Sequence, residues 1–196
     1  MPMLPDFIRA KFTAVLAGYL PLAEFEQWLY ATPELETALP PDDYLELISL
    51  NYKGRDATQE VEILLSRHID WSDLRRDELL CTLRSITLHS APDTLFAAFV
   101  SCYDWYCRGC LFLEVLGLDF GLRVDDEYGW GGSMGKWQNL TEAAKQQYLS
   151  SYFPAAQYEA EQVIGWLTAG LIRFDNEPYP SGEDRVGYTD LRPDTP

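Results

Sequence analysis

The sequence has little positive charge. Its 196 residues include 15 Lys and Arg against 31 Asp and Glu, so the formal net charge is −16. Surfaces that hold nucleic acid need Lys and Arg against the phosphates, and anionic membranes attract basic segments. The composition therefore predicts neither a nucleic-acid partner nor a membrane partner. It fits two alternatives, attraction to a basic protein or simple solubility.

Long hydrophobic runs, targeting segments and a disulfide pattern are also missing. The sequence has no run of about 18 apolar residues, which a transmembrane helix needs. Residues 1–5 contain no basic residue with which a signal peptide would begin. Three of the four cysteines, Cys102, Cys107 and Cys110, crowd one apolar segment, whereas secreted scaffolds spread theirs over loops. These absences predict a cytoplasmic protein.

The apolar residues that are present follow helical spacing nearly throughout. They make up 47% of the chain, enough for one sizeable core. Glycine and proline mark helix boundaries, as where Gly18 ends one helix and Pro21 begins the next. We expect an all-α fold, a single-domain multi-helix bundle over residues 1–175. Residues 94–116 are its most apolar segment and are expected to form a central buried helix that Gly117 ends.

Two segments depart from helical spacing. Residues 118–139 hold five glycines, two tryptophans and a run of three acidic residues. We expect a long irregular loop there, with a short strand near 121–124, and loops of this length are often functional. Residues 176–196 are rich in proline, glycine and aspartate, and are expected to form a loosely held C-terminal tail.

Recognisable catalytic motifs are missing as well. The sequence contains no H-E-x-x-H, G-x-S-x-G, Walker or dinucleotide-binding pattern. Cys102, Cys107 and Cys110 have the spacing C-x4-C-x2-C but lack the second pair of ligands that a metal site needs. We interpret them as core residues, and expect no catalytic residue, metal or cofactor. The alternative is a metal- or thiol-dependent enzyme that uses this cluster.

The negative charge is concentrated in one part of the chain. No Lys or Arg lies between Lys11 and Lys53, whereas this span carries seven acidic residues. Such a stretch makes a negative field that speeds encounter with a cationic partner, although a solvated helix face is the competing interpretation. The candidate partner-binding residues are Glu34, Glu36, Asp42, Asp43 and Glu46, with a second patch of Asp125, Asp126, Glu127 and Trp130, whose indole would be an aromatic anchor.

Two stretches of sequence resemble a known group of proteins. One is residues 25–30 (FEQWLY), continuing through 34–36 (ELE) to 44–52 (YLELISLNY), and the other is 103–113 (YDWYCRGCLFL) with 116–122 (LGLDFGL). Both are similar to small acidic helical immunity proteins encoded beside bacterial polymorphic toxins. The resemblance implies a protein that binds and neutralises a cognate toxin, one that is basic if it attacks nucleic acid. An adaptor that oligomerises through its tyrosines and tryptophans is a further alternative, and the sequence leaves the oligomeric state open.

Overall fold

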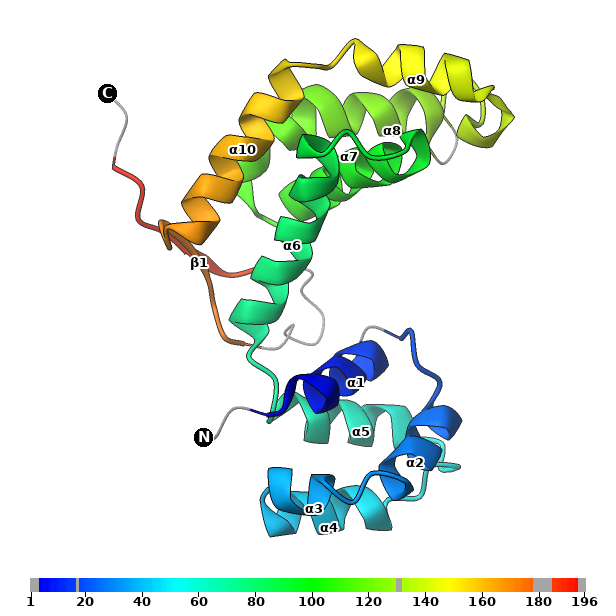
Figure 1. Ribbon diagram of the computed structural model, residues 1–196, viewed down its shortest axis with the longest axis vertical. Coiled ribbons are helices and arrows are strands. Elements are labelled where there is room, and N and C mark those ends of the chain that lie inside the picture. Colours follow the sequence, from blue (N-terminus) through cyan, green and yellow to red (C-terminus); the bar gives the residue numbers. More distant parts are fainter. Residues whose placement is uncertain (1–3, 17, 130–131, 178–184, 194–196) are drawn as a thin grey trace. The chain divides into compact units, whose positions relative to one another are not determined.

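The computed structural model describes residues 4–16, 18–129, 132–177 and 185–193. Within these residues it contains ten α-helices and a small two-stranded sheet, which confirms the all-α class (Figure 1). The chain divides into two compact units, Met1–Asp70 and Trp71–Pro196, called unit 1 and unit 2 below. The sequence instead predicts one helical domain over 1–175. The difference arises because apolar periodicity identifies helices but does not say which helices share a core.

The described residues of unit 1 form five helices. Pro21 directly precedes α2, and Pro41 occupies the first position of α4. The first N–H groups of a helix have no partner within the helix, so a proline there costs no backbone hydrogen bond. The helices are α1 (Asp6–Leu16), α2 (Leu22–Tyr30), α3 (Leu35–Ala38), α4 (Pro41–Ser49) and α5 (Ala57–Ser66).

Aromatic rings form the centre of the unit 1 core. Phe12 of α1 and Phe25 of α2 are fully buried and meet edge to face, with ring centroids 6.1 Å apart. Tyr52, after α4, lies 6.2 Å from Phe25, and its hydroxyl donates a hydrogen bond of 2.9 Å to the carbonyl oxygen of Leu47. This bond satisfies the polar atom that the buried tyrosine brings into the core, so the end of α4 is held against α2.

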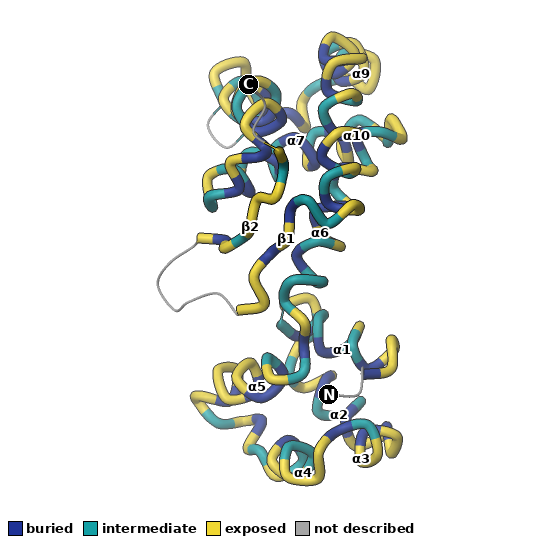
Figure 2. The backbone as a smooth tube through the Cα atoms, turned by 90° about the vertical axis from the view of Figure 1, so that its left-hand side faces the viewer, coloured by how far each residue is buried: buried dark blue, intermediate teal, exposed yellow. Residues whose placement is uncertain are grey.

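Unit 2 contains longer helices and a two-stranded sheet. In it α7 packs against η2 and α6, and α10 packs along α6 (Figures 1 and 2). Its α-helices are α6 (Trp71–Thr87), α7 (Pro92–Cys107), α8 (Arg123–Tyr128), α9 (Glu142–Ser150) and α10 (Ala155–Thr168). Its other elements are the 3₁₀ helices η1 (Leu111–Leu113) and η3 (Trp137–Asn139), the π-helix η2 (Val115–Leu122), and the strands β1 (Ile172–Phe174) and β2 (Tyr188–Asp190).

The expected central helix and the expected loop after it are both corrected. The α7 helix ends at Cys107, and Gly109 follows with a φ of +99°, a left-handed conformation that favours glycine. The chain then forms η1, η2 and α8 in succession, so residues 118–128 are helical, whereas a loop over 118–139 with a strand near 121–124 was expected.

Close packing explains why glycines occur within this helical stretch. A Cβ atom on Gly117 would lie 2.7 Å from the Cβ of Tyr106, and one on Gly121 would lie 2.9 Å from the Cβ of Tyr103. Both distances are shorter than carbon–carbon contact. The two glycines therefore allow η2 to lie directly against α7, and they are not signs of a loop.

Part of the expected C-terminal tail belongs to the packed structure. Strand β2 pairs antiparallel with β1, with Phe174 opposite Tyr188. Val186 is buried, and the Arg192 guanidinium lies 4.3 Å from the centre of the Trp166 ring. Residues 185–193 are thus tied to unit 2 by backbone pairing and side-chain stacking. Residues 178–184 and 194–196 lie outside the described part of the chain.

Candidate partner-binding surfaces

The first group of predicted residues lies on α3 and α4, which pack together in unit 1. Leu35 of α3 and Leu47 of α4 are fully buried and fix which side of each short helix faces the core. Helical spacing then places Asp42, Leu45 and Glu46 on the outer face of α4. The apolar pattern predicts Leu45 on the inner face, yet 56% of this side chain is exposed. Sequence reasoning therefore missed an exposed leucine among the acidic residues.

Two of the predicted acidic residues are neutralised within unit 1. The Arg67 Nη1 atom donates to Asp43 Oδ1 at 3.0 Å and to Glu46 Oε2 at 3.1 Å. His68, whose side chain is almost fully buried, places Nε2 at 3.1 Å from Asp43 Oδ2. Burial lowers the pKa of His68, and the Asp43 charge opposes that effect. Asp43 therefore acts mainly inside the unit, where it links α4 to the end of α5.

Three predicted residues remain available to a partner. Glu34, Glu36 and Asp42 are all exposed. Within the described part of the chain, none of their side chains has a hydrogen bond or an ion pair with another residue. Together with Leu45 they form a surface with acidic groups and one apolar side chain, which we call the α3–α4 surface.

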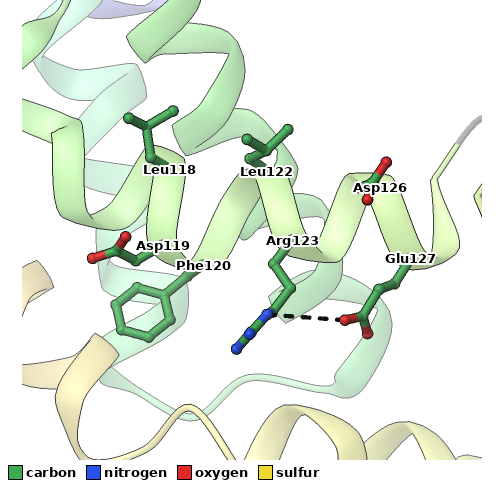
Figure 3. Close-up of a pocket in the computed structure, with 7 residues that line it drawn as sticks. All are labelled: Leu118, Asp119, Phe120, Leu122, Arg123, Asp126 and Glu127. Atoms are coloured by element: carbon green, nitrogen blue, oxygen red, sulfur yellow. Dashed lines mark ion pairs between the residues drawn. The ribbon is translucent and has the colours of Figure 1, made fainter.

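The second group of predicted residues does not form one patch. Asp126 of α8 is exposed, whereas Glu127 lies 3.9 Å from Arg123 Nε (Figure 3) and shares a hydrogen bond with Tyr148. Asp125 is half-buried. Burial of Asp104 raises the pKa of that carboxyl group, and the nearby negative charge of Asp125 raises it further. Consecutive positions on a helix point in different directions, so the acidic run is divided. Trp130, the expected aromatic anchor, lies outside the described residues.

A shallow hollow of about 640 Å³ lies along η2 and α8. Figure 3 shows Leu118, Leu122 and Asp126 on one side of the ribbon, with Arg123 and Glu127 turned to the other. The mixture of leucines and carboxylates resembles a protein-contact surface more than a small-molecule pocket, which is deeper and more enclosed. The lining residues are Leu118, Asp119, Phe120, Leu122, Arg123, Asp126 and Glu127.

The clustered cysteines differ in their exposure to solvent. Cys102 and Cys110 are buried, and burial raises the pKa of each thiol to about 12, which disfavours the reactive thiolate. Cys107 is exposed, contrary to its interpretation as a core residue.

The described residues contain no group of three or more His, Cys, Asp or Glu side chains placed to hold a metal ion. In the same part of the chain, no helix combines the length and apolarity needed to cross a membrane.

The chain matches no protein-family model, no curated protein and no solved structure with which it was compared.

Proposed function

We propose that this protein is an immunity protein that binds a cognate basic toxin and blocks its active surface. The α3–α4 surface is the main contact in this proposal. The observation that carries it is the set of unpaired carboxylates of Glu34, Glu36 and Asp42 at α3 and α4, two helices that pack together, with the exposed Leu45 on α4. The resemblance of residues 25–52 to immunity proteins supports the same function.

The composition of this surface suits rapid and specific binding. Carboxylates without internal partners attract a cationic surface over several ångströms and raise the association rate. An exposed leucine among them offers apolar area that is removed from water on contact, as in the centre of many interfaces. Toxins that attack nucleic acid need cationic surfaces for their anionic substrate. An acidic protein that occupies such a surface inhibits the toxin without any chemistry of its own.

The structure indicates which residues to change in a test. Reversal of Asp43 or Glu46 would disturb the ion pairs with Arg67, so an effect on binding could come from altered packing. The triple variant Glu34→Lys, Glu36→Lys, Asp42→Lys changes the exposed charges alone. Its matched control reverses three exposed acidic residues near the start of α5 and has the same net charge: Asp56→Lys, Glu60→Lys, Glu62→Lys.

The experiment has two stages. The wild-type protein captures its partner from lysate of the source organism, and the dissociation constant of the purified partner is then measured for each variant at low and high salt. We expect the α3–α4 variant to bind at least about tenfold more weakly and to lose most of its salt dependence, with little change for the control. Co-expression should show that the variant no longer prevents the toxicity of the partner. Equal affinity of both variants at every salt concentration would contradict the proposal.

A further inference from the structure

A row of apolar side chains runs along the outside of η1 and η2. Leu111 is 61% exposed, Val115 38% and Leu122 37%, and Leu118 between them is half-buried. Leu118 and Leu122 point to the same side of the ribbon in Figure 3, and Leu111 and Val115 precede them along the chain. We call these four residues the η2 stripe.

The opposite side of η2 explains why the stripe faces outward. Leu116, Gly117 and Gly121 are buried, and the two glycines lie against α7. Rotation of η2 to hide the leucines would move side chains into this close contact. A π-helix is rare and frequently occurs at a functional site. Here the segment is held by its glycine contacts while Val115 and Leu122 remain exposed and Leu118 half-buried, a combination that folding alone does not require.

Acidic residues flank the stripe. Glu114 just before η2, Asp119 within η2 and Asp126 of α8 are exposed, and Asp119 and Asp126 line the hollow together with Leu118 and Leu122. Arg123 and Glu127 line the same hollow and lie 3.9 Å apart. In Figure 3 Asp126 lies on the side of the two leucines, and Asp119 lies on the side of Arg123. The apolar row therefore has a border that is mainly negative.

We propose that the η2 stripe is a docking surface for a cationic amphipathic helix of the partner protein. The source of that helix rests on the proposed function, whereas its chemistry follows from the stripe. Apolar residues on one face of the helix pack on Leu118 and Leu122, and Lys or Arg residues beside them lie near Asp119 and Asp126. A second copy of this chain fits poorly, because it would bring the same carboxylates together.

A defined peptide tests the stripe without knowledge of the partner. The probe is a fluorescent synthetic peptide of Leu and Lys, about 18 residues or five helical turns, with the leucines on one face. Its affinity for the full-length protein is measured by fluorescence anisotropy. We expect Leu118→Asp with Leu122→Asp to weaken binding at least about tenfold. The control is Leu88→Asp, which places one such charge at a leucine that is 75% exposed and outside the stripe, and it should bind within about twofold of wild type.

A second variant tests the stripe even if the leucine variant fails to fold. Asp119→Lys with Asp126→Lys keeps the leucines, and should weaken peptide binding and reduce its salt dependence while circular dichroism stays unchanged. No binding of the peptide to the wild type, or equal binding to the leucine variant, overturns the proposal. So does a dimer of the wild type that the leucine variant abolishes, because the stripe would then be a contact between copies.

The α3–α4 variant separates this proposal from the proposed function. We expect it to bind the peptide within about twofold of wild type, although it loses the toxin. If it loses the peptide as completely as the leucine variant does, the peptide is held by net charge and the stripe proposal fails, while the proposed function stands. If it keeps the toxin, while the leucine variant loses the peptide, the proposed function fails and the stripe stands.

Discussion

Both units are acidic, and in each of them some carboxylates are paired with cations and others are not. Residues 1–70 carry twelve acidic against five basic side chains, and residues 71–196 carry nineteen against ten. Unit 2 ties several of its carboxylates to its own cations, as where Lys145 Nζ lies 2.7 Å from Asp93 and 3.0 Å from Glu142. The α3–α4 surface of unit 1 has carboxylates without such partners. The comparison teaches that pairing within the fold, and not net charge, determines which acidic residues remain available.

The two cores differ as well. The core of unit 1 is built by large side chains around Phe12 and Phe25, on helices of ordinary geometry. The core of unit 2 also depends on close backbone approach, because η2 lies on α7 through Gly117 and Gly121. Truncation of a large side chain should therefore be the sensitive change in unit 1, and enlargement of a small one the sensitive change in unit 2.

The largest effect is expected from Phe12→Ala, which leaves a cavity in the fully buried core of unit 1. The free energy of unfolding should fall by about 3–5 kcal/mol, measured by urea denaturation. Hydrogen exchange should show the loss of protection in α1–α5 first. The control is Phe7→Ala on the same helix, a side chain that is half exposed, with an effect within about 0.5 kcal/mol. Equal loss of protection in α6–α10 would show that the two units do not unfold as separate cores.

The next largest effect is expected from Gly121→Ala in unit 2. The added Cβ would meet the Phe99 carbonyl and the Tyr103 side chain, so η2 must shift and stability should fall by about 1–3 kcal/mol. The control is Gly165→Ala in α10, where a Cβ meets nothing within 4 Å. Since alanine favours a helix, that variant should gain about 0.5–1 kcal/mol. Thermal unfolding of both variants measures the difference, and a neutral Gly121→Ala would refute the close approach of η2 to α7.

A smaller effect concerns the pH dependence of unit 1. Burial lowers the pKa of folded His68 below the unfolded value of 6.5. Above pH 6.5 both states are neutral at this residue, so it contributes no pH dependence. As the pH falls below 6.5 the unfolded chain takes up the proton more readily, and stability is lost.

Urea denaturation between pH 7 and pH 5 measures this loss. His68→Gln should lose less stability than the wild type over this interval. His89→Asn is the control, because His89 is exposed and asparagine tolerates its positive φ of 48°. This control should keep the wild-type slope, and an unchanged slope for His68→Gln would show that His68 is not the group responsible.

The smallest effect on stability is expected from Arg67→Gln. Both ion pairs of Arg67 lie at the surface, and such pairs contribute little to folding. The variant frees Asp43 and Glu46, however, and should extend the α3–α4 surface and tighten binding of the proposed partner at low salt. The measurement is the dissociation constant at two salt concentrations. Weaker binding would indicate that Arg67 holds these carboxylates in the orientation that the partner needs.

Much of the local structure could be predicted from the sequence. Pro21 and Pro41 mark the starts of α2 and α4, and the Thr141 hydroxyl accepts from Ala144 N at 3.3 Å, as expected of a helix cap. These features follow from neighbours along the chain. Loops were harder to predict, because Gly121 looks the same in sequence whether it breaks a helix or allows two helices to touch.

The candidate sites were predictable only in part. The absence of cations between Lys11 and Lys53 drew attention to the acidic residues of this span, of which Glu34, Glu36, Asp42 and Glu46 are exposed. It did not reveal that Arg67, far along the chain, neutralises Asp43 and Glu46. The apolar residues Leu111, Val115, Leu118 and Leu122 of the η2 stripe are visible in the sequence. However, an apolar segment of this kind is equally consistent with a buried core.

The sequence by itself determined the helical class, the excess of negative charge and the positions of most helix ends, because these depend on composition and on residues a few positions apart. Tertiary structure decided the division into two units, the burial of Cys102 beside the exposure of Cys107, and the separation of paired from unpaired carboxylates. Each of these depends on which distant residues meet in space. Local periodicity does not carry that information, since the same spacing permits more than one face to be buried.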